Sequence, residues 1–187
     1  MMSAAYTALL VCLVACSSSG SSASIDGTVR GSPIVTSTIA STIVTSTSSS
    51  EAFIVMSSAT SCADPSAIVQ HPGEQTVLFI LTDNTASTSQ APTSPGVYTV
   101  SASDTPPAKA AQVEVNVLDA TCVNDADLGA VATGGAVTLT SVNGGAFAGT
   151  FDVTLETGEH VSGSFDSDAC STLADELRST TTPPCQP

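Results

Sequence analysis

The stretch from residue 134 to residue 166 places an apolar residue at every second position, which is the periodicity of a β-strand with one buried face. Asn143-Gly144-Gly145 and Thr157-Gly158 interrupt the alternation with residues that favour tight turns. The stretch therefore predicts a three-stranded antiparallel meander. Its apolar face must be covered by other strands, because so small a sheet cannot bury that face alone.

Strand and turn signals alternate through most of the remaining chain, as they do in all-β domains. The run Thr76–Leu81 is continuously apolar and predicts a strand that is buried on both faces. Together with the meander, the signals give eight or nine short strands, and we expect an antiparallel β-sandwich or barrel. The other predicted strands are 24–31, 51–57, 96–101 and 112–118, and the predicted loops are 62–73, 83–95 and 104–109.

A short internal repeat in residues 34–47 can be interpreted in two ways. Ile34-Val35-Thr36-Ser37-Thr38 recurs as Ile43-Val44-Thr45-Ser46-Thr47. These residues favour extended backbone, because they are β-branched or compete for backbone hydrogen bonds. Two copies are too few for a solenoid. The repeat predicts either two neighbouring strands, or one strand followed by a Ser-rich loop at 46–50.

A helical pattern occurs only near the C-terminus, at Ser171–Arg178. Ser171 is a suitable N-cap residue. Leu173 and Leu177 are four residues apart and would share one face of the helix. We expect a short helix that packs both leucines against the body of the domain.

The apolar run from Ala4 to Ala15 is too short to span a bilayer, which takes about 20 residues, but it has the length of a signal-peptide core. Its end, Leu13-Val14-Ala15-Cys16, resembles the lipobox of bacterial lipoproteins. The resemblance implies cleavage before Cys16 and lipid attachment to that cysteine, so that the membrane is a partner through an acyl anchor. No Lys or Arg precedes Cys16, which departs from the family pattern. The alternatives are an ordinary secretory signal cut near Ala15, or a buried strand that carries the cysteine by chance.

The lipobox resemblance also implies a domain organisation and a location. Residues 1–15 would be the lipoprotein signal peptide, 16–23 a Ser-rich tether and 24–187 the β-rich domain. The mature protein would be exported and held by its lipid on the bacterial cell envelope. An outer-membrane or cell-surface position is expected.

The six cysteines fit an exported chain. Cys12 lies within the apolar run and would be removed, and Cys16 would carry the lipid. Four cysteines remain for two disulfides, with three ways to pair them. These four are Cys62, Cys122, Cys170 and Cys185.

Spacing does not select one pairing. Cys170 and Cys185 close a short loop, which favours that pair and would leave Cys62 with Cys122. A Cys122–Cys170 bridge is the main competitor. A zinc site is disfavoured, because the chain contains no C-x-x-C and no histidine that forms a ligand motif with a cysteine.

The charge balance excludes two classes of function. The chain has 3 Lys and Arg against 17 Asp and Glu, and its net charge is −14. Nucleic-acid binding needs a basic face on the protein, and so does attachment to a membrane surface through a polybasic patch. Three cations cannot make either. We therefore expect no nucleic-acid partner and a solvated acidic exterior.

Catalytic motifs are missing from the sequence. There is no G-x-S-x-G elbow, no H-E-x-x-H, no Walker loop and no dinucleotide fingerprint. His160 follows Glu159 beside a predicted hairpin turn, and His71 precedes Pro72 in a predicted loop. Both histidines are read as surface residues. We expect a protein that is not an enzyme and has no cofactor.

Calcium is the strongest remaining chemical candidate. Asn124-Asp125-Ala126-Asp127 and Asp166-Ser167-Asp168 each group oxygen-bearing side chains. Calcium takes six to eight oxygen ligands, however, and neither group matches the EF-hand pattern. We favour solvated acidic loops and assign no metal site.

A second resemblance covers Gly134–Cys170. This segment is similar to the C-terminal part of uncharacterised β-rich lipoproteins of myxobacterial type. The resemblance implies an exported, anchored β-domain and transfers no functional residue. Its three motifs are G-x-V-x-L-T at Gly135–Thr140, G-T-F-D-V-T-x at Gly149–Leu155 and a G-x-F strand closing on a cysteine at Gly163–Cys170.

Three functions follow as expectations, in order of preference. The first is a lipid-anchored, non-catalytic envelope or cell-surface protein with a structural or binding role. The second is a small-molecule carrier that uses a barrel interior. The third is an anchored hydrolase.

Overall fold

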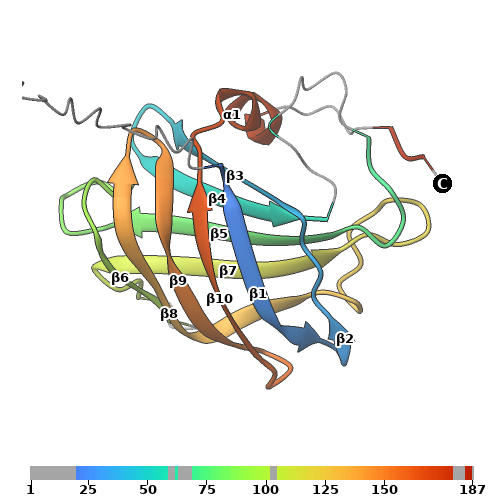
Figure 1. Cartoon of the computed structure of the whole chain (residues 1–187). Helices are drawn as coiled ribbons and strands as arrows, with labels where there is room; N and C mark the ends of the chain where they lie inside the picture. Colours follow the sequence, from blue (N-terminus) through green and yellow to red (C-terminus); the bar gives the residue numbers. More distant parts are fainter. Residues whose placement is uncertain (1–19, 59–61, 63–68, 102–104, 179–183, 187) are drawn as a thin grey trace, which may run out of the picture.

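The computed structural model describes residues 20–58, 62, 69–101, 105–178 and 184–186. These residues form ten strands and one helix (Figure 1). The elements are β1 (Ser22–Val29), β2 (Ser32–Pro33), β3 (Thr38–Thr45), β4 (Ser50–Ser57), β5 (Gln75–Asp83), β6 (Gly96–Ser101), β7 (Lys109–Val117), β8 (Ala130–Asn143), β9 (Ala146–Leu155), β10 (His160–Ser167) and α1 (Ser171–Arg178).

All ten strands belong to one sheet, in the order β2-β1-β10-β9-β8-β6-β7-β5-β4-β3. The sheet is curled into a half-barrel, so that β1, β8, β9 and β10 cross over β4, β5 and β7 at a steep angle (Figure 1). Neighbouring strands are antiparallel except β6 and β7, which pair in parallel over two residues. The curl makes two layers out of one sheet.

Strand β8 forms the bend between these layers. Its start pairs with β7, where Ala130 lies opposite Val115, and the rest of the strand pairs with β6 and β9. The register to β9 shifts between Ala132 and Gly134. Gly135 has a φ of +107°, and a Cβ there would overlap the backbone of Asp152. Glycine at this point therefore allows the two strands to approach as closely as the bend requires.

One hydrophobic core fills the space between the two layers. Phe79 of β5 lies at its centre, with its ring centroid 4.9 Å from that of Phe151 on β9 and 5.9 Å from that of Phe165 on β10. The core draws on alternate residues of nearly every strand, because successive side chains point to opposite faces. Burying a large apolar side chain stabilises a fold by about 1.5–3 kcal/mol, so this interior holds the curled sheet together.

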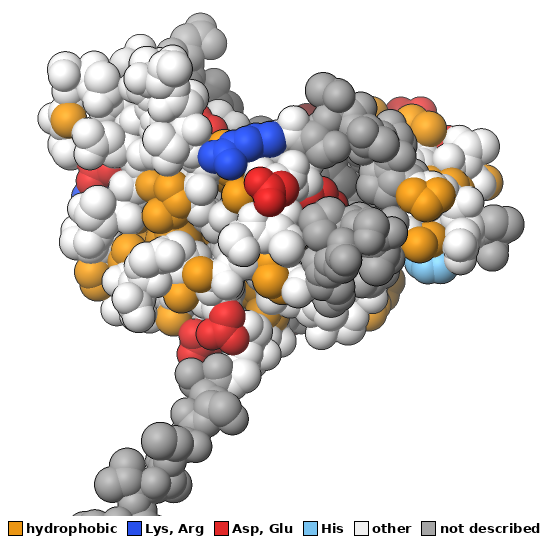
Figure 2. Space-filling model, turned by 90° about the horizontal axis from the view of Figure 1, so that it is seen from above, with side chains coloured by type: hydrophobic (Ala, Val, Ile, Leu, Met, Phe, Trp, Pro, Cys, Tyr) orange, Lys and Arg blue, Asp and Glu red, His pale blue; other side chains and the backbone are white. Residues whose placement is uncertain are grey.

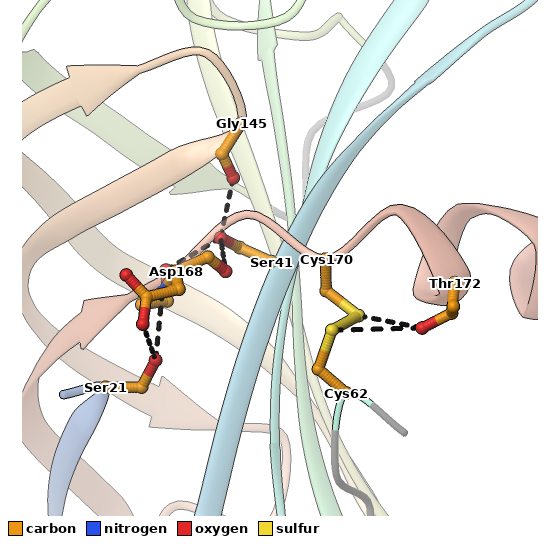
Figure 3. Close-up of a disulfide and its surroundings, with 8 residues drawn as sticks. Ser21, Ser41, Cys62, Gly145, Asp168, Cys170 and Thr172 are labelled. Atoms are coloured by element: carbon orange, nitrogen blue, oxygen red, sulfur yellow. Dashed lines mark hydrogen bonds between the residues drawn. A yellow bond between two sulfur atoms is a disulfide. The ribbon is translucent and has the colours of Figure 1, made fainter. Parts of the chain in front are cut away.

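Ser41 of the edge strand β3 joins that edge to the end of β10 and to the turn between β8 and β9 (Figure 3). Its backbone N–H donates to the carbonyl of Asp168 over 3.3 Å, and its carbonyl accepts from the N–H of Cys170 over 2.7 Å. Its hydroxyl donates to the carbonyl of Gly145 over 2.7 Å and lies 2.8 Å from the hydroxyl of Ser167. Both serines are buried. We call these contacts the Ser41 seam.

The carboxylate of Glu159 holds the turn between β1 and β2. It accepts hydrogen bonds from the backbone N–H groups of Arg30 and Gly31 and from the hydroxyls of Thr28 and Thr157, over 2.6–2.8 Å. These donors, led by the N–H of Gly31, lower the pKa of Glu159 to about 2. The turn needs this support, because Arg30 has a φ of +50°, which is uncommon outside glycine.

The predicted all-β class is confirmed, as are the meander of β8, β9 and β10 and the helix at Ser171–Arg178. The repeat does not form two strands: β3 runs from Thr38 to Thr45 and takes its residues from both copies. Burial of β5 on both faces was a wrong prediction, because Val77, Phe79 and Leu81 are buried while the residues between them are partly exposed. The strand lies in a curled sheet with one covered face.

Candidate functional site

The outer face of β4 and β5 is apolar over much of its length. Phe53 lies opposite Ile80 in the register, and Val55 lies opposite Leu78. Partners in an antiparallel ladder share a face, and the residues between these four point into the core. The four side chains therefore form an apolar strip on the outside of the half-barrel, where strands normally carry polar residues.

Helix α1 covers one end of this strip (Figure 1). Leu173 is buried in a second, smaller core with Ala40, Val55 and Cys170, and Leu78 packs against its edge. The predicted inward orientation of Leu173 is confirmed, whereas Leu177 is 39% exposed. The helix is thus seated by its first turn, and its last turn lies at the surface.

A disulfide between Cys62 and Cys170 fixes the start of the helix (Figure 3). It links the segment that follows β4 to the residue just before α1, across 108 positions of sequence. The hydroxyl of Thr172, in the first turn of the helix, lies 3.1 Å from the sulfur of Cys170. The bridge therefore ties the cover to the strip that it covers.

Between α1 and the sheet lies an open cleft of about 180 Å³. We call it the α1 cleft. Its walls are half apolar and half polar, and they come from β4, β5, β7, α1 and the segments next to these strands. The apolar residues are Val55, Leu78, Leu118, Leu173 and Leu177, and the polar ones are Gln70, Glu74, Thr76, Asn116 and Glu176.

Glu74 is the most deeply placed carboxylate of the α1 cleft, with 9% of its surface exposed. One of its oxygens accepts from the hydroxyl of Ser57 over 3.0 Å, and the other accepts from the N–H of His71 over 3.4 Å. Gln70 lines the same cleft, and its side-chain oxygen is buried without a hydrogen-bond partner among the described residues. Buried polar oxygens of this kind normally find a donor.

Glu176 lies on the helix side of the α1 cleft. Burial, and after it the negative charge of Glu74, raises the pKa of this carboxyl above its usual value. Both effects disfavour the ionised form. The α1 cleft therefore places the carboxyl of Glu176 under the influence of a second carboxyl group, that of Glu74.

A second hollow, of about 250 Å³, lies further along the same outer face. Its lining includes Ile80 and Thr82 of β5, Ala110 and Gln112 of β7 and Glu51 of β4. The α1 cleft and this hollow therefore occupy successive stretches of β5, and the apolar strip contributes Leu78 to the first and Ile80 to the second.

The four predicted cysteines form two disulfides, which confirms that part of the prediction. The pairs are Cys62–Cys170 and Cys122–Cys185, so the favoured pairing of Cys170 with Cys185 was wrong, as was the Cys122–Cys170 alternative. The reason is positional: Cys170 leaves β10 directly beside β3, whose carbonyl at Ser41 accepts its N–H. Proximity in space overrides the short loop between Cys170 and Cys185.

The two acidic segments use their side chains within the fold. The carboxylate of Asp125 accepts from the N–H of Asp127 over 2.8 Å, and the amide of Asn124 donates to that of Asn116 over 2.7 Å. The carboxylate of Asp168 accepts from the hydroxyl of Ser21 over 3.0 Å. Among the described residues, no three His, Cys, Asp or Glu side chains are grouped as metal ligands.

Both histidines are exposed, and they contact different kinds of group. The Nε2 atom of His160 lies 2.9 Å from a carboxylate oxygen of Asp152, on an exposed stretch of β9 and β10. The Nδ1 atom of His71 lies 3.0 Å from the carbonyl oxygen of Gln186. The structure brings neither histidine together with another predicted site residue.

Sequence reasoning missed the α1 cleft. Gln70 belongs to the predicted loop 62–73, Glu74 follows that loop, and Glu176 matches no motif within the predicted helix. One indication was present in the sequence. Phe53, Leu78 and Ile80 are apolar, although the alternation of buried residues in their strands predicts that they point outward. The sequence around these residues does not show which other segments pack against them.

The two disulfides indicate an exported protein, because such bonds persist in oxidising compartments. Cys16 and the lipobox lie outside the described residues. In the part of the chain that the structure covers, no helix has the length and apolar character needed to cross a membrane. Comparison with protein-family models, with curated proteins and with solved structures gives no match.

Proposed function

We propose that this protein is a lipid-anchored, non-catalytic module of the bacterial cell envelope, with a binding role carried by the outer face of its half-barrel. The observation that carries the binding role is the apolar strip with the α1 cleft at its covered end. Val55 is buried beneath α1, whereas Phe53, Leu78 and Ile80 each keep part of their apolar surface exposed. A partly open apolar strip beside a cleft is a kind of surface that binds partners or ligands.

The core supports an outer binding face over a carrier function. Phe79, Phe151 and Phe165 meet at the centre of the half-barrel, where a carrier would need room for its ligand.

Anchoring by lipid is supported by Leu13-Val14-Ala15-Cys16 and by the distribution of charge. No charged side chain precedes Cys16, so the mature body keeps its formal charge of −14. An acyl anchor attaches such a body to a membrane without a basic patch, and two or more chains give stable attachment.

Metabolic labelling with a radioactive fatty acid tests the anchor. The wild-type chain is expected to take up label and to fractionate with membranes, whereas Cys16→Ala removes the label. Cys12→Ala is the matched control, because it alters a cysteine of the same apolar run and should leave labelling unchanged. An unlabelled wild-type chain would overturn the proposal of a lipid anchor.

A further inference from the structure

The α1 cleft differs from an ordinary surface depression in the chemistry of its lining. Five aliphatic side chains line it together with two carboxyl groups and Gln70, whose side-chain oxygen is buried without a partner among the described residues. We call these two sets of residues the apolar wall and the polar wall. Its volume of about 180 Å³ lies below the roughly 300 Å³ at which drug-sized ligand pockets begin. The cleft therefore fits a group about as large as one side chain.

The lining of the α1 cleft contains oxygen acceptors and no Lys or Arg. The chain has three such cations, and all three are engaged elsewhere. Arg30 donates to the carbonyls of Gly129 and Ala126, Lys109 lies over the ring of Tyr98, and Arg178 donates to the carbonyl of Thr45. Seen from above, charged side chains are few and scattered on this side of the molecule (Figure 2).

We propose that the α1 cleft binds an aliphatic primary ammonium group, with the ammonium between Gln70, Glu74 and Glu176 and its carbon stem against Leu78, Leu118 and Leu173. This inference deepens the proposed binding role and rests on it.

An ammonium group suits the polar wall. It has three N–H donors and no acceptor, and the wall offers a buried amide oxygen and two carboxyl groups. A positive charge there also offsets the burial and the like-charge repulsion that raise the pKa of Glu176. Hydrogen bonds that involve an ionised partner are stronger than neutral ones.

The apolar wall selects among cations. A hydrated calcium ion needs six to eight oxygens and gains nothing from leucine side chains. An alkylammonium ion lays its methylene stem along apolar surface and keeps its charged head at the polar end, as lysine side chains do. The same chemistry can come from a free alkylamine or from a lysine of a partner protein, and the test separates these sources.

The test follows backbone amide signals of the full chain in detergent micelles by NMR during titration. The probes are n-pentylammonium, neutral n-pentanol of similar shape, Nα-acetyl-lysine amide, and the same lysine derivative with its side-chain amine acetylated. We expect saturable shifts at Leu118, Leu173 and Glu176 with the amine, and binding weaker by about tenfold with the alcohol, since a charged hydrogen bond contributes about 1.5–3 kcal/mol.

The lysine derivative identifies the source. If it binds as well as pentylammonium and its acetylated form does not, a protein lysine is the ligand. If only the free amine binds, the ligand is a small amine. Equal binding of amine and alcohol, or shifts that lie outside the cleft, would overturn the proposal. None of these outcomes bears on lipid attachment, which the labelling experiment tests separately.

Glu176→Gln should weaken pentylammonium binding by about tenfold. Asp175→Asn is the matched control, since it removes the same charge from the adjacent helix position and lies outside the cleft lining. Asp175 is exposed, Glu176 is partly exposed, and neither belongs to the buried cluster that seats the helix, so both variants should keep the wild-type melting temperature. Unchanged affinity in Glu176→Gln, or an equal loss in Asp175→Asn, would show that the carboxyl of Glu176 does not hold the ligand.

Discussion

The two halves of the curled sheet share an inner face of one kind and have different outer faces. On β9, β10 and β1 the outward residues are mainly Ser, Thr and Asp, such as Thr150, Asp152 and Ser164, and they lie in solvent. On β4 and β5 the outward residues include Phe53, Leu78 and Ile80, and helix α1 covers part of them. We call these the polar half and the apolar half.

This difference shows that a strand with an apolar outer face needs another element to cover that face, whereas a strand with a polar outer face does not. The polar half is complete once its inner face is buried, because Ser and Thr side chains are solvated on the other side. The apolar half needs a cover, and the chain supplies one with eight helical residues and a disulfide. The cover is seated on the strip through Leu173, and the α1 cleft lies between this cover and the sheet.

The largest expected effect comes from releasing the cover of the apolar half. The double variant Cys62→Ala, Cys170→Ala should lower the free energy of unfolding by about 2–5 kcal/mol, because the disulfide restrains a long stretch of unfolded chain. Urea unfolding without reductant measures it. The NMR signals of α1 should change more than those of the polar half. A uniform change across both halves would contradict the claim that this disulfide mainly holds the cover of the apolar half.

A close backbone approach in the polar half gives the next largest effect. Gly163 on β10 has no space for a Cβ, which would overlap the carbonyl of Ser24 and lie 2.7 Å from the ring of Phe151. Gly163→Ala should therefore cost about 1–3 kcal/mol of unfolding free energy, the usual range for overpacking. Gly20→Ala, with nothing within 4 Å, is the control. Equal stability of the two variants would mean that β10 and its neighbours can move apart enough to accept a Cβ at this position without cost.

The Ser41 seam connects the two halves, and its loss should have an intermediate effect. Ser41→Ala removes the donor to Gly145 and leaves buried polar groups without a partner, at a cost of about 1–3 kcal/mol. Ser24→Ala removes an exposed hydroxyl contact with Ser164 and should stay within about 0.5 kcal/mol. Thermal unfolding compares them, and two similar melting temperatures would count against the seam.

The smallest expected effect is a pH dependence in the polar half. The lowered pKa of Glu159, about 2, means that its contribution is complete above the ordinary glutamate pKa and is lost as the pH falls toward 2. Melting temperature measured between pH 6 and pH 2 should fall less for Glu159→Gln than for wild type. Glu156→Gln is the control, because the exposed ion pair of Glu156 with Arg30, at 3.9 Å, contributes little to stability, and this variant should follow the wild-type curve closely. Parallel curves for wild type and Glu159→Gln would remove Glu159 as the support of the β1–β2 turn.

The sequence by itself determined the features that depend on near neighbours. The alternation in 134–166 gave the meander, because side chains two apart share a face of any strand. Ser171 and the leucine spacing gave the helix, and the number of cysteines gave two disulfides.

Only the tertiary structure decided how these elements combine. The edge strand β3 lies beside Ser167–Cys170, and this brings Cys170 to the part of the sheet from which Cys62 follows. A loop-length argument could not foresee that arrangement. The α1 cleft was decided in the same way, since Gln70, Glu74 and Glu176 approach one another only after the sheet has curled. Side-chain periodicity is a local property of the backbone, whereas strand order depends on the free energy of the whole buried core.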